Sequence, residues 1–233
     1  MNGPRWGYLS FLAPGHGRHQ CCGKHRSVDR KPNRKPEITY MAKPEQHRVT
    51  VDGMRIRTDR LVLRPWSLQD AAAALAVYSR SEVSRWLAPA MEAVADESAM
   101  TAVLKQWIDQ CSALEAPAGR WAVELADSGE LIGAAAVLPL PPDGVDLEIG
   151  WQLAPAHWGH GLATEAGHAV AHYTFTQGVD EVFAVVRPRN TRGTATARRV
   201  GMEWVGETQK YYGLTLQVYR LRKGDLDLPT IPT

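Results

Sequence analysis

Two kinds of hydrophobic spacing alternate along residues 54–224 and predict a domain of mixed α and β structure. Apolar residues recur at intervals of three and four between residues 96 and 114, which is typical of an amphipathic helix. Between residues 145 and 153 apolar and polar residues alternate, as in a strand with one buried face. The same criteria predict further helices at 67–78, 81–87, 161–177 and 190–201. They predict further strands at 61–63, 121–125, 130–138, 181–186, 203–206 and 216–221.

The order of these elements favours an α+β fold over a doubly wound sheet. Turn sequences at 127–129 and 141–144 join consecutive strands as hairpins, and the helix at 161–177 is the crossover that follows the fourth strand. We therefore expect a mixed, mostly antiparallel central sheet of about seven strands, flanked by about four helices.

Charge and composition divide the chain into three parts. Residues 1–53 are rich in Gly, Pro, Arg, Lys and His without an apolar period, and predict a disordered basic extension. The folded domain is expected at 54–224 and a short tail at 225–233. A basic arm can bind nucleic acid in a salt-sensitive way, but a solvated arm is the simpler interpretation, and we do not expect nucleic acid as a partner.

Apolar runs in the chain fall short of the ~18 residues of a membrane span, and no secretory pattern is present. Three cysteines without a pairing pattern fit a reducing compartment. We expect a cytoplasmic monomer or homodimer without a membrane partner. The cluster of His16, His19, Cys21, Cys22 and His25 lacks zinc-site spacing, and the pair His168 and His172 lacks the intervening Glu of metalloprotease helices, so no metal is expected.

A glycine pair immediately before a helix is the strongest chemical signal. Gly159 and Gly161 allow the backbone to approach a ligand closely, and the helix start that follows offers free N–H groups and a positive dipole end, which suit a pyrophosphate. Thr164 can add a hydroxyl donor. Thr164 also occupies the place of the third glycine of a dinucleotide-binding motif, and no P-loop Gly-Lys-Ser/Thr is present.

The segment from Glu148 to Ala166 resembles the central motif of the GCN5-related N-acetyltransferases (GNAT), closest to the RimJ/RimL-like branch, and the resemblance covers about residues 55–222. It implies acetyl-CoA as co-substrate. It also implies that backbone groups of Trp151, Gln152 and Leu153 bind the pantetheine arm. The pyrophosphate is then held by the loop of Trp158, Gly159, His160, Gly161, Leu162, Ala163 and Thr164.

Downstream of the loop, Asn190 matches the asparagine that contacts CoA in this family, while Gly193 replaces the usual Ser, so that second contact is expected to be lost. A plain helix N-cap is the other interpretation of Asn190, and the two roles are compatible.

Acyl transfer to an amine needs a base, an oxyanion donor and a leaving thiolate. Glu148 is the expected general base, and Asp146 on the same strand face could share or substitute for the role. The alternative interpretation is that Glu148 is a solvent-facing carboxylate without a catalytic role. The oxyanion donor is expected to be a backbone N–H near Gln152 or Leu153. A proton for the thiolate could come from Tyr211 or Tyr212, or the thiolate could leave unaided.

These features predict transfer of an acetyl group from acetyl-CoA to a primary amine, by direct attack in a ternary complex. The acceptor is left open between a protein N-terminus and a small-molecule amine. The alternative function is a CoA-binding sensor or accessory module without turnover.

Overall fold

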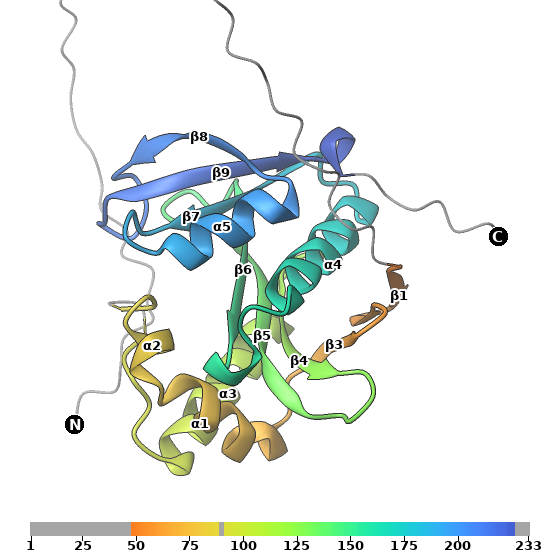
Figure 1. Cartoon of the computed structure of the whole chain (residues 1–233), viewed down its shortest axis with the longest axis vertical. Helices are drawn as coiled ribbons and strands as arrows, with labels where there is room; N and C mark the ends of the chain where they lie inside the picture. The colour runs from red at the N-terminus through yellow and green to blue at the C-terminus, as the bar shows by residue number, and fades with distance from the viewer. Residues whose placement is uncertain (1–47, 89–90, 227–233) are drawn as a thin grey trace, which may run out of the picture.

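The computed structural model describes residues 48–88 and 91–226, and it confirms the α+β fold (Figure 1). Within this part of the chain the strands form one nine-stranded sheet in the order β1-β2-β3-β4-β5-β6-β7-β9-β8. All neighbours are antiparallel except β6 and β7, which are parallel. The strands are β1 Thr50–Asp52, β2 Arg55–Arg57, β3 Leu61–Pro65, β4 Gly119–Leu125, β5 Leu131–Pro139, β6 Leu147–Leu153, β7 Glu181–Val186, β8 Glu203–Thr208 and β9 Leu216–Arg222.

Two of these strands were missed by the sequence pattern. β1 and β2 are three residues each, and Ile56 is the one buried side chain of the two strands. Their sequences therefore lack the alternation of apolar and polar residues that predicts a strand. β1 also lies inside the segment expected to be a disordered extension, so ordered structure starts before residue 54. The rest of that extension, with its His/Cys cluster, and residues 227–233 of the expected tail lie outside the described residues.

Helices cover both faces of the sheet. α4 Leu162–Thr176 and α5 Thr191–Val200 pack on the face that carries Trp121 and Val123. α1 Ala71–Tyr78 and α3 Glu97–Ser112 pack on the opposite face, over Ala122 and Ala134. The remaining helices are α2 Ser81–Ser84 and the 3-10 segments Leu68–Asp70, Pro155–His157 and Lys223–Asp225. None of the helices in the described ranges combines the length and apolarity needed to cross a membrane.

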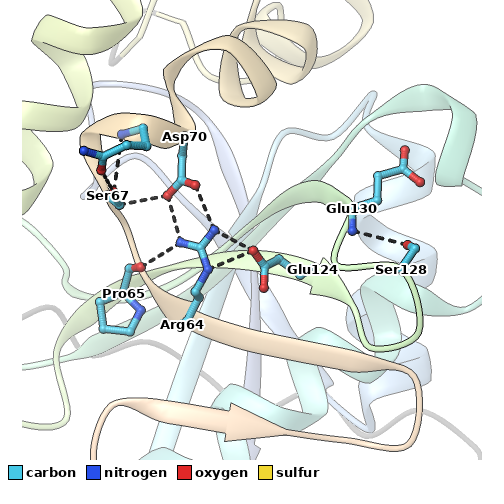
Figure 2. A network of polar contacts seen from close by, with 8 residues as sticks. Arg64, Pro65, Ser67, Asp70, Glu124, Ser128 and Glu130 are labelled. Atoms are coloured by element: carbon cyan, nitrogen blue, oxygen red, sulfur yellow. Dashed lines mark hydrogen bonds and ion pairs between the residues drawn. The ribbon is translucent and has the colours of Figure 1, made fainter.

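Arg64 fastens the start of the first helical segment to the sheet (Figure 2). Its guanidinium reaches both oxygens of Asp70 at 2.8 Å and also binds Glu124 on β4. Asp70 closes a capping box with Ser67. Burial would raise the Asp70 pKa, but hydrogen bonds from Arg64 and the Ser67 backbone outweigh it and lower that pKa below its usual value. The network fixes where α1 begins and therefore where Tyr78, at its end, meets the functional site.

Candidate functional site

The sheet opens between β6 and β7. Glu148 and Phe183 are the one registered pair between these strands, whereas β6 pairs with β5 along its whole length. A cavity of about 1310 Å³ occupies this side of the molecule. Its walls come from β4, β5, β6, β7, the loop before α4, the start of α5, residues 78–88 with Met91, α3, and the hairpin between β8 and β9. The separation leaves part of the β6 backbone without a strand partner on the β7 side.

The hydrogen-bond register decides which backbone groups of β6 face the gap. Ala154 N–H donates to the Ile132 carbonyl at 2.8 Å, and pairing alternates from there along the antiparallel ladder. By this alternation the backbone groups of Gln152 pair with β5, while those of Trp151 and Leu153 point toward the gap. The sequence had treated the three residues alike, because the direction of the ladder cannot be read from the residue types.

The glycine loop has the backbone conformation that only glycine adopts easily. Gly159 and Gly161 have φ angles of +84° and +76°, and Gly161 is the N-cap of α4. Both line the cavity together with Trp158, Leu162, Ala163 and Thr164. His160, by contrast, is exposed, and its carbonyl accepts a hydrogen bond from Arg60 at 2.9 Å. The free N–H groups at the start of α4 therefore lie at the cavity wall, as a pyrophosphate cradle requires.

A buried carboxylate supports this loop from beneath. Glu165, in the first turn of α4, is fully buried. Arg60 Nε lies 2.6 Å from its Oε2, and the Arg60 backbone N–H and the Thr58 hydroxyl donate to its Oε1 at 3.0 and 2.6 Å. Because Arg60 also holds the His160 carbonyl, one guanidinium ties the loop to the helix. This role was not predicted from the sequence. The position of Glu165 among the small and apolar residues Ala166, Ala169 and Val170 could have indicated a buried carboxylate.

Trp158 closes the end of β6. Its indole N–H donates to the Leu153 carbonyl at 2.8 Å, and the Arg192 guanidinium lies 4.6 Å from the ring centroid. The ring therefore fixes the Leu153 carbonyl while leaving the Leu153 N–H directed at the gap. Arg192 lies in the first turn of α5 and adds positive charge beside the loop, which favours an anionic ligand.

Asn190 is the N-cap of α5, and its side chain accepts from the Gly193 N–H at 3.0 Å. Both residues line the cavity. A Cβ at position 193 would lie 2.7 Å from Asn190 Nδ2 and 3.0 Å from Val186 Cγ1. In this structure the Asn190 side chain thus occupies the space in which the Cβ of a Ser at 193 would lie.

Glu148 projects from β6 into the cavity, where the Tyr212 hydroxyl donates to its Oε2 at 2.7 Å. Burial raises its pKa from the model-compound value to about 7, against the lowering effects of the Tyr212 hydrogen bond, the Arg120 charge and the Val185 backbone. A carboxyl group titrating near neutral pH inside a cavity is suited to taking up a proton during a reaction.

The neighbouring pair of acidic and aromatic residues lies elsewhere. Tyr211 packs with Leu140 and Leu216 in a small separate cluster, and its hydroxyl donates to Asp146 at 3.3 Å. Lys210 approaches Asp146 at 4.0 Å. Between the open alternatives, Glu148 and Tyr212 are therefore the residues that face the cavity, and Asp146 and Tyr211 brace the hairpin outside it.

Tyr212 has an unusual backbone. Its φ angle is +55°, the one positive value among the described non-glycine residues. This left-handed conformation costs a non-glycine residue of the order of 1 kcal/mol and is retained where surrounding contacts enforce it. Burial, followed by the Glu148 charge and the hydrogen bond to it, raises the Tyr212 pKa well above its usual value, so the phenol keeps its proton.

No cluster of three or more His, Cys, Asp or Glu side chains that could hold a metal ion occurs among residues 48–88 and 91–226. The arrangement of the cavity, with a backbone gap, a glycine loop at a helix start and one titrating carboxylate, fits an acyl thioester with a diphosphate on one side and a nucleophile on the other.

Comparison with known proteins agrees with this geometry. A family model described as "Acetyltransferase (GNAT) domain" matches residues 60–203. An uncharacterized N-acetyltransferase of Bacillus subtilis, YoaA, is 30% identical over 158 residues, which cover 67% of this chain and 86% of the relative. Among solved structures, Mycobacterium smegmatis RimJ in complex with CoA-disulfide has a TM-score of 0.62 at 20% identity, covering 78% of this chain and 87% of that one.

A second solved structure is the aminoglycoside acetyltransferase AAC(6')-Ib in complex with coenzyme A. Its TM-score is 0.58 at 19% identity, covering 71% of this chain and 96% of that chain. At such identities the two structures support the shared fold and leave the acceptor open.

Proposed function

The chain belongs to the GNAT acetyltransferase family and is an acetyl-CoA-dependent N-acetyltransferase, and on that premise we propose that it acetylates a primary amine with Glu148 as general base. The amine attacks the thioester directly in a ternary complex. Glu148 accepts the amine proton, directly or through a water, and the CoA sulfur leaves as thiolate. The pKa of Glu148 near 7 supports this role, because such a carboxylate is partly ionised at neutral pH and is a stronger base than an ordinary glutamate.

The donor would bind along the open side of β6. The backbone groups of Trp151 and Leu153 would contact the pantetheine arm, and the N–H groups of Gly161 to Thr164 would hold the pyrophosphate. Gln152 would contribute through its side chain, which accepts from the Tyr78 hydroxyl at 3.3 Å, since its backbone groups belong to the β5 ladder.

The oxyanion of the tetrahedral intermediate needs a donor directed into the gap. The Leu153 N–H is our choice over that of Gln152, because the register directs it away from β5. Tyr212 would hold Glu148 in place through its hydrogen bond. Its location in the cavity also makes it, rather than Tyr211, the candidate donor of a proton to the thiolate.

The acceptor is either a protein N-terminus or a small-molecule amine. RimJ and the aminoglycoside acetyltransferase share the fold. Placement in the RimJ/RimL-like branch is part of the proposal, supported by the Trp158 loop.

The observation that carries the proposal is the position of Glu148 in the cavity that the glycine loop also lines, where it accepts a hydrogen bond from Tyr212. The test is consumption of acetyl-CoA by wild type and Glu148→Gln against a panel of peptide N-termini and small amines. We expect Glu148→Gln to bind CoA normally and to lose about 10²-fold or more in turnover. Tight CoA binding by wild type without turnover on any acceptor would instead favour a CoA-binding sensor.

A further inference from the structure

A second ionic side chain faces the same cavity from the middle of the sheet. Arg120 on β4 is registered with Ala136 on β5, which is registered with Gly150 on β6. Directly opposed residues point to the same face, and Glu148, two residues from Gly150, shares it. Ala136 and Gly150 carry little or no side chain, so no bulky side chain stands on the line of register from Arg120 to β6. Strands β4 and β6 are separated by two strand spacings, about 10 Å.

The surroundings of Arg120 are aromatic. Its guanidinium carbon lies 5.1 Å from the centroid of the Trp107 ring on α3, and Trp107 in turn meets Tyr78 edge-on at 5.3 Å. All three residues line the cavity. They form a wall of the acceptor side, which is the side of the sheet opposite α4.

Arg120 lacks the partner that a buried guanidinium normally has. Its Nε atom is shielded from solvent and has no hydrogen-bond partner. Within the described ranges no carboxylate forms an ion pair with it, and Glu148 affects it only through its more distant charge. Arg64, by contrast, is held by both Asp70 and Glu124.

An unpaired guanidinium in such a place is costly. Desolvation lowers the Arg120 pKa, which reflects the cost of keeping the charge away from water. Its planar donors match a carboxylate in a bidentate arrangement, and a bound carboxylate offsets the cost. Glu148 is not that partner in the described part of the chain, where it forms no ion pair with Arg120 and accepts from the Tyr212 hydroxyl at 2.7 Å.

We propose that Arg120 is an anion subsite of the acceptor pocket, and that the preferred acceptor is an amine that also carries a carboxylate. The inference rests on the proposed function, since it places the amine at Glu148 and the carboxylate at Arg120. The carboxylate could belong to a small amino acid or to an acidic side chain next to a peptide N-terminus, and these share the chemistry that Arg120 recognises.

Matched acceptor pairs test the subsite. β-Alanine and 4-aminobutyrate are compared with their carboxamides, and alanyl-aspartate amide is compared with alanyl-asparagine amide. Wild type should favour the carboxylate member of at least one pair by about 10- to 100-fold in kcat/KM, the range of a charge-assisted hydrogen bond. The small pairs and the peptide pair separate the two sources of the carboxylate.

Arg120→Gln should reduce this preference to about onefold and leave the Kd for CoA unchanged. Its rates are compared within each pair, because loss of the Arg120 charge also raises the Glu148 pKa and so alters the rate with both members. Arg57→Gln on β2 is the matched control, because Arg57 is exposed and does not line the cavity. Thermal unfolding checks that both variants fold. If Arg120→Gln does not fold, the subsite is tested by the wild-type protein alone. Equal kcat/KM values for the two members of every acceptor pair would then overturn the subsite.

Binding separates this inference from the proposed function. The same pairs are titrated calorimetrically into CoA-saturated wild type and Arg120→Gln. Carboxylate-selective binding that depends on Arg120, without acetylation of any acceptor, would support the subsite and count against Glu148 chemistry. Acetylation that does not discriminate within the pairs, or a preference that survives Arg120→Gln, would overturn the subsite and leave the proposed function standing.

Discussion

The ratio of wild-type to Glu148→Gln activity should depend on pH in a defined way. The Glu148 carboxyl group has a pKa of about 7 because burial penalises its charged form. Only the carboxylate can accept the amine proton, so the advantage of wild type over the variant should follow its ionised fraction. The acceptor amine titrates in both proteins, and its ionisation therefore cancels in the ratio.

The expected size follows from the pKa. With a pKa of about 7, roughly one-tenth of the carboxyl group is ionised at pH 6 and roughly nine-tenths at pH 8. If wild type exceeds Glu148→Gln by about 100-fold at pH 8, it should exceed it by about 10-fold at pH 6. The assay is release of the CoA thiol, measured as kcat/KM at half-unit steps between pH 5.5 and 9 (roughly the range that spans the titration).

Two results would refute the reasoning. A ratio that is constant across this pH range would mean that Glu148 does not titrate within it, either because it is not the base or because the cavity leaves its pKa near the ordinary glutamate value. A ratio that is larger at pH 6 than at pH 8 would mean that the carboxylate is not the active form. The Kd for CoA, measured alongside, should be equal in the two proteins, because the donor contacts proposed for β6 come from its backbone.

Tyr212→Phe removes a hydrogen bond that lowers the Glu148 pKa. The midpoint of the kcat/KM profile should therefore move upward by up to about one pH unit. A uniform loss of kcat/KM at every pH would instead indicate that the phenol donates the proton to the thiolate. Glu165→Gln should lower unfolding stability by roughly 1–3 kcal/mol in urea titration and weaken CoA binding, because the loop loses its buried brace; unchanged CoA affinity would contradict that role. Gly193→Ser should lower the melting temperature without improving CoA affinity, since its Cβ would lie 2.7 Å from Asn190 Nδ2, and tighter CoA binding would show that the space is available.

Local patterns were sufficient for most of the fold. The helix at 96–114 was predicted from its three-and-four spacing and is observed as Glu97–Ser112. The helix at 161–177 is Leu162–Thr176. Strands with one buried face were recovered to within a few residues. The pair at Thr50–Asp52 and Arg55–Arg57 was missed, because short strands with exposed side chains carry no hydrophobic period.

Contacts between distant parts of the chain could not be predicted in the same way. Tyr212 lies 64 positions from Glu148, and Arg60 lies 105 positions from Glu165. The choice between Tyr211 and Tyr212 was left open because consecutive residues normally point apart, and the positive φ of Tyr212 breaks any simple alternation there. Arg120 gave no signal at all, since a single arginine in a strand is ordinary until its neighbours are known.

The alternating directions of backbone groups and side chains along β6 explain why the donor contacts could be predicted from the sequence and the acceptor contacts could not. Along β6, the backbone groups of Trp151 and Leu153 face the gap, while the side chains of Glu148 and Gln152 point to the acceptor side. In the proposed function, donor recognition therefore depends on main-chain groups within a contiguous stretch of sequence, which a motif can specify. Acceptor recognition, as we propose it, depends on side chains such as Arg120 from separate elements, which no contiguous motif can specify. It follows that acceptor preference can be altered on β4 or the last hairpin while CoA affinity stays the same, and Glu148 is where the two requirements meet.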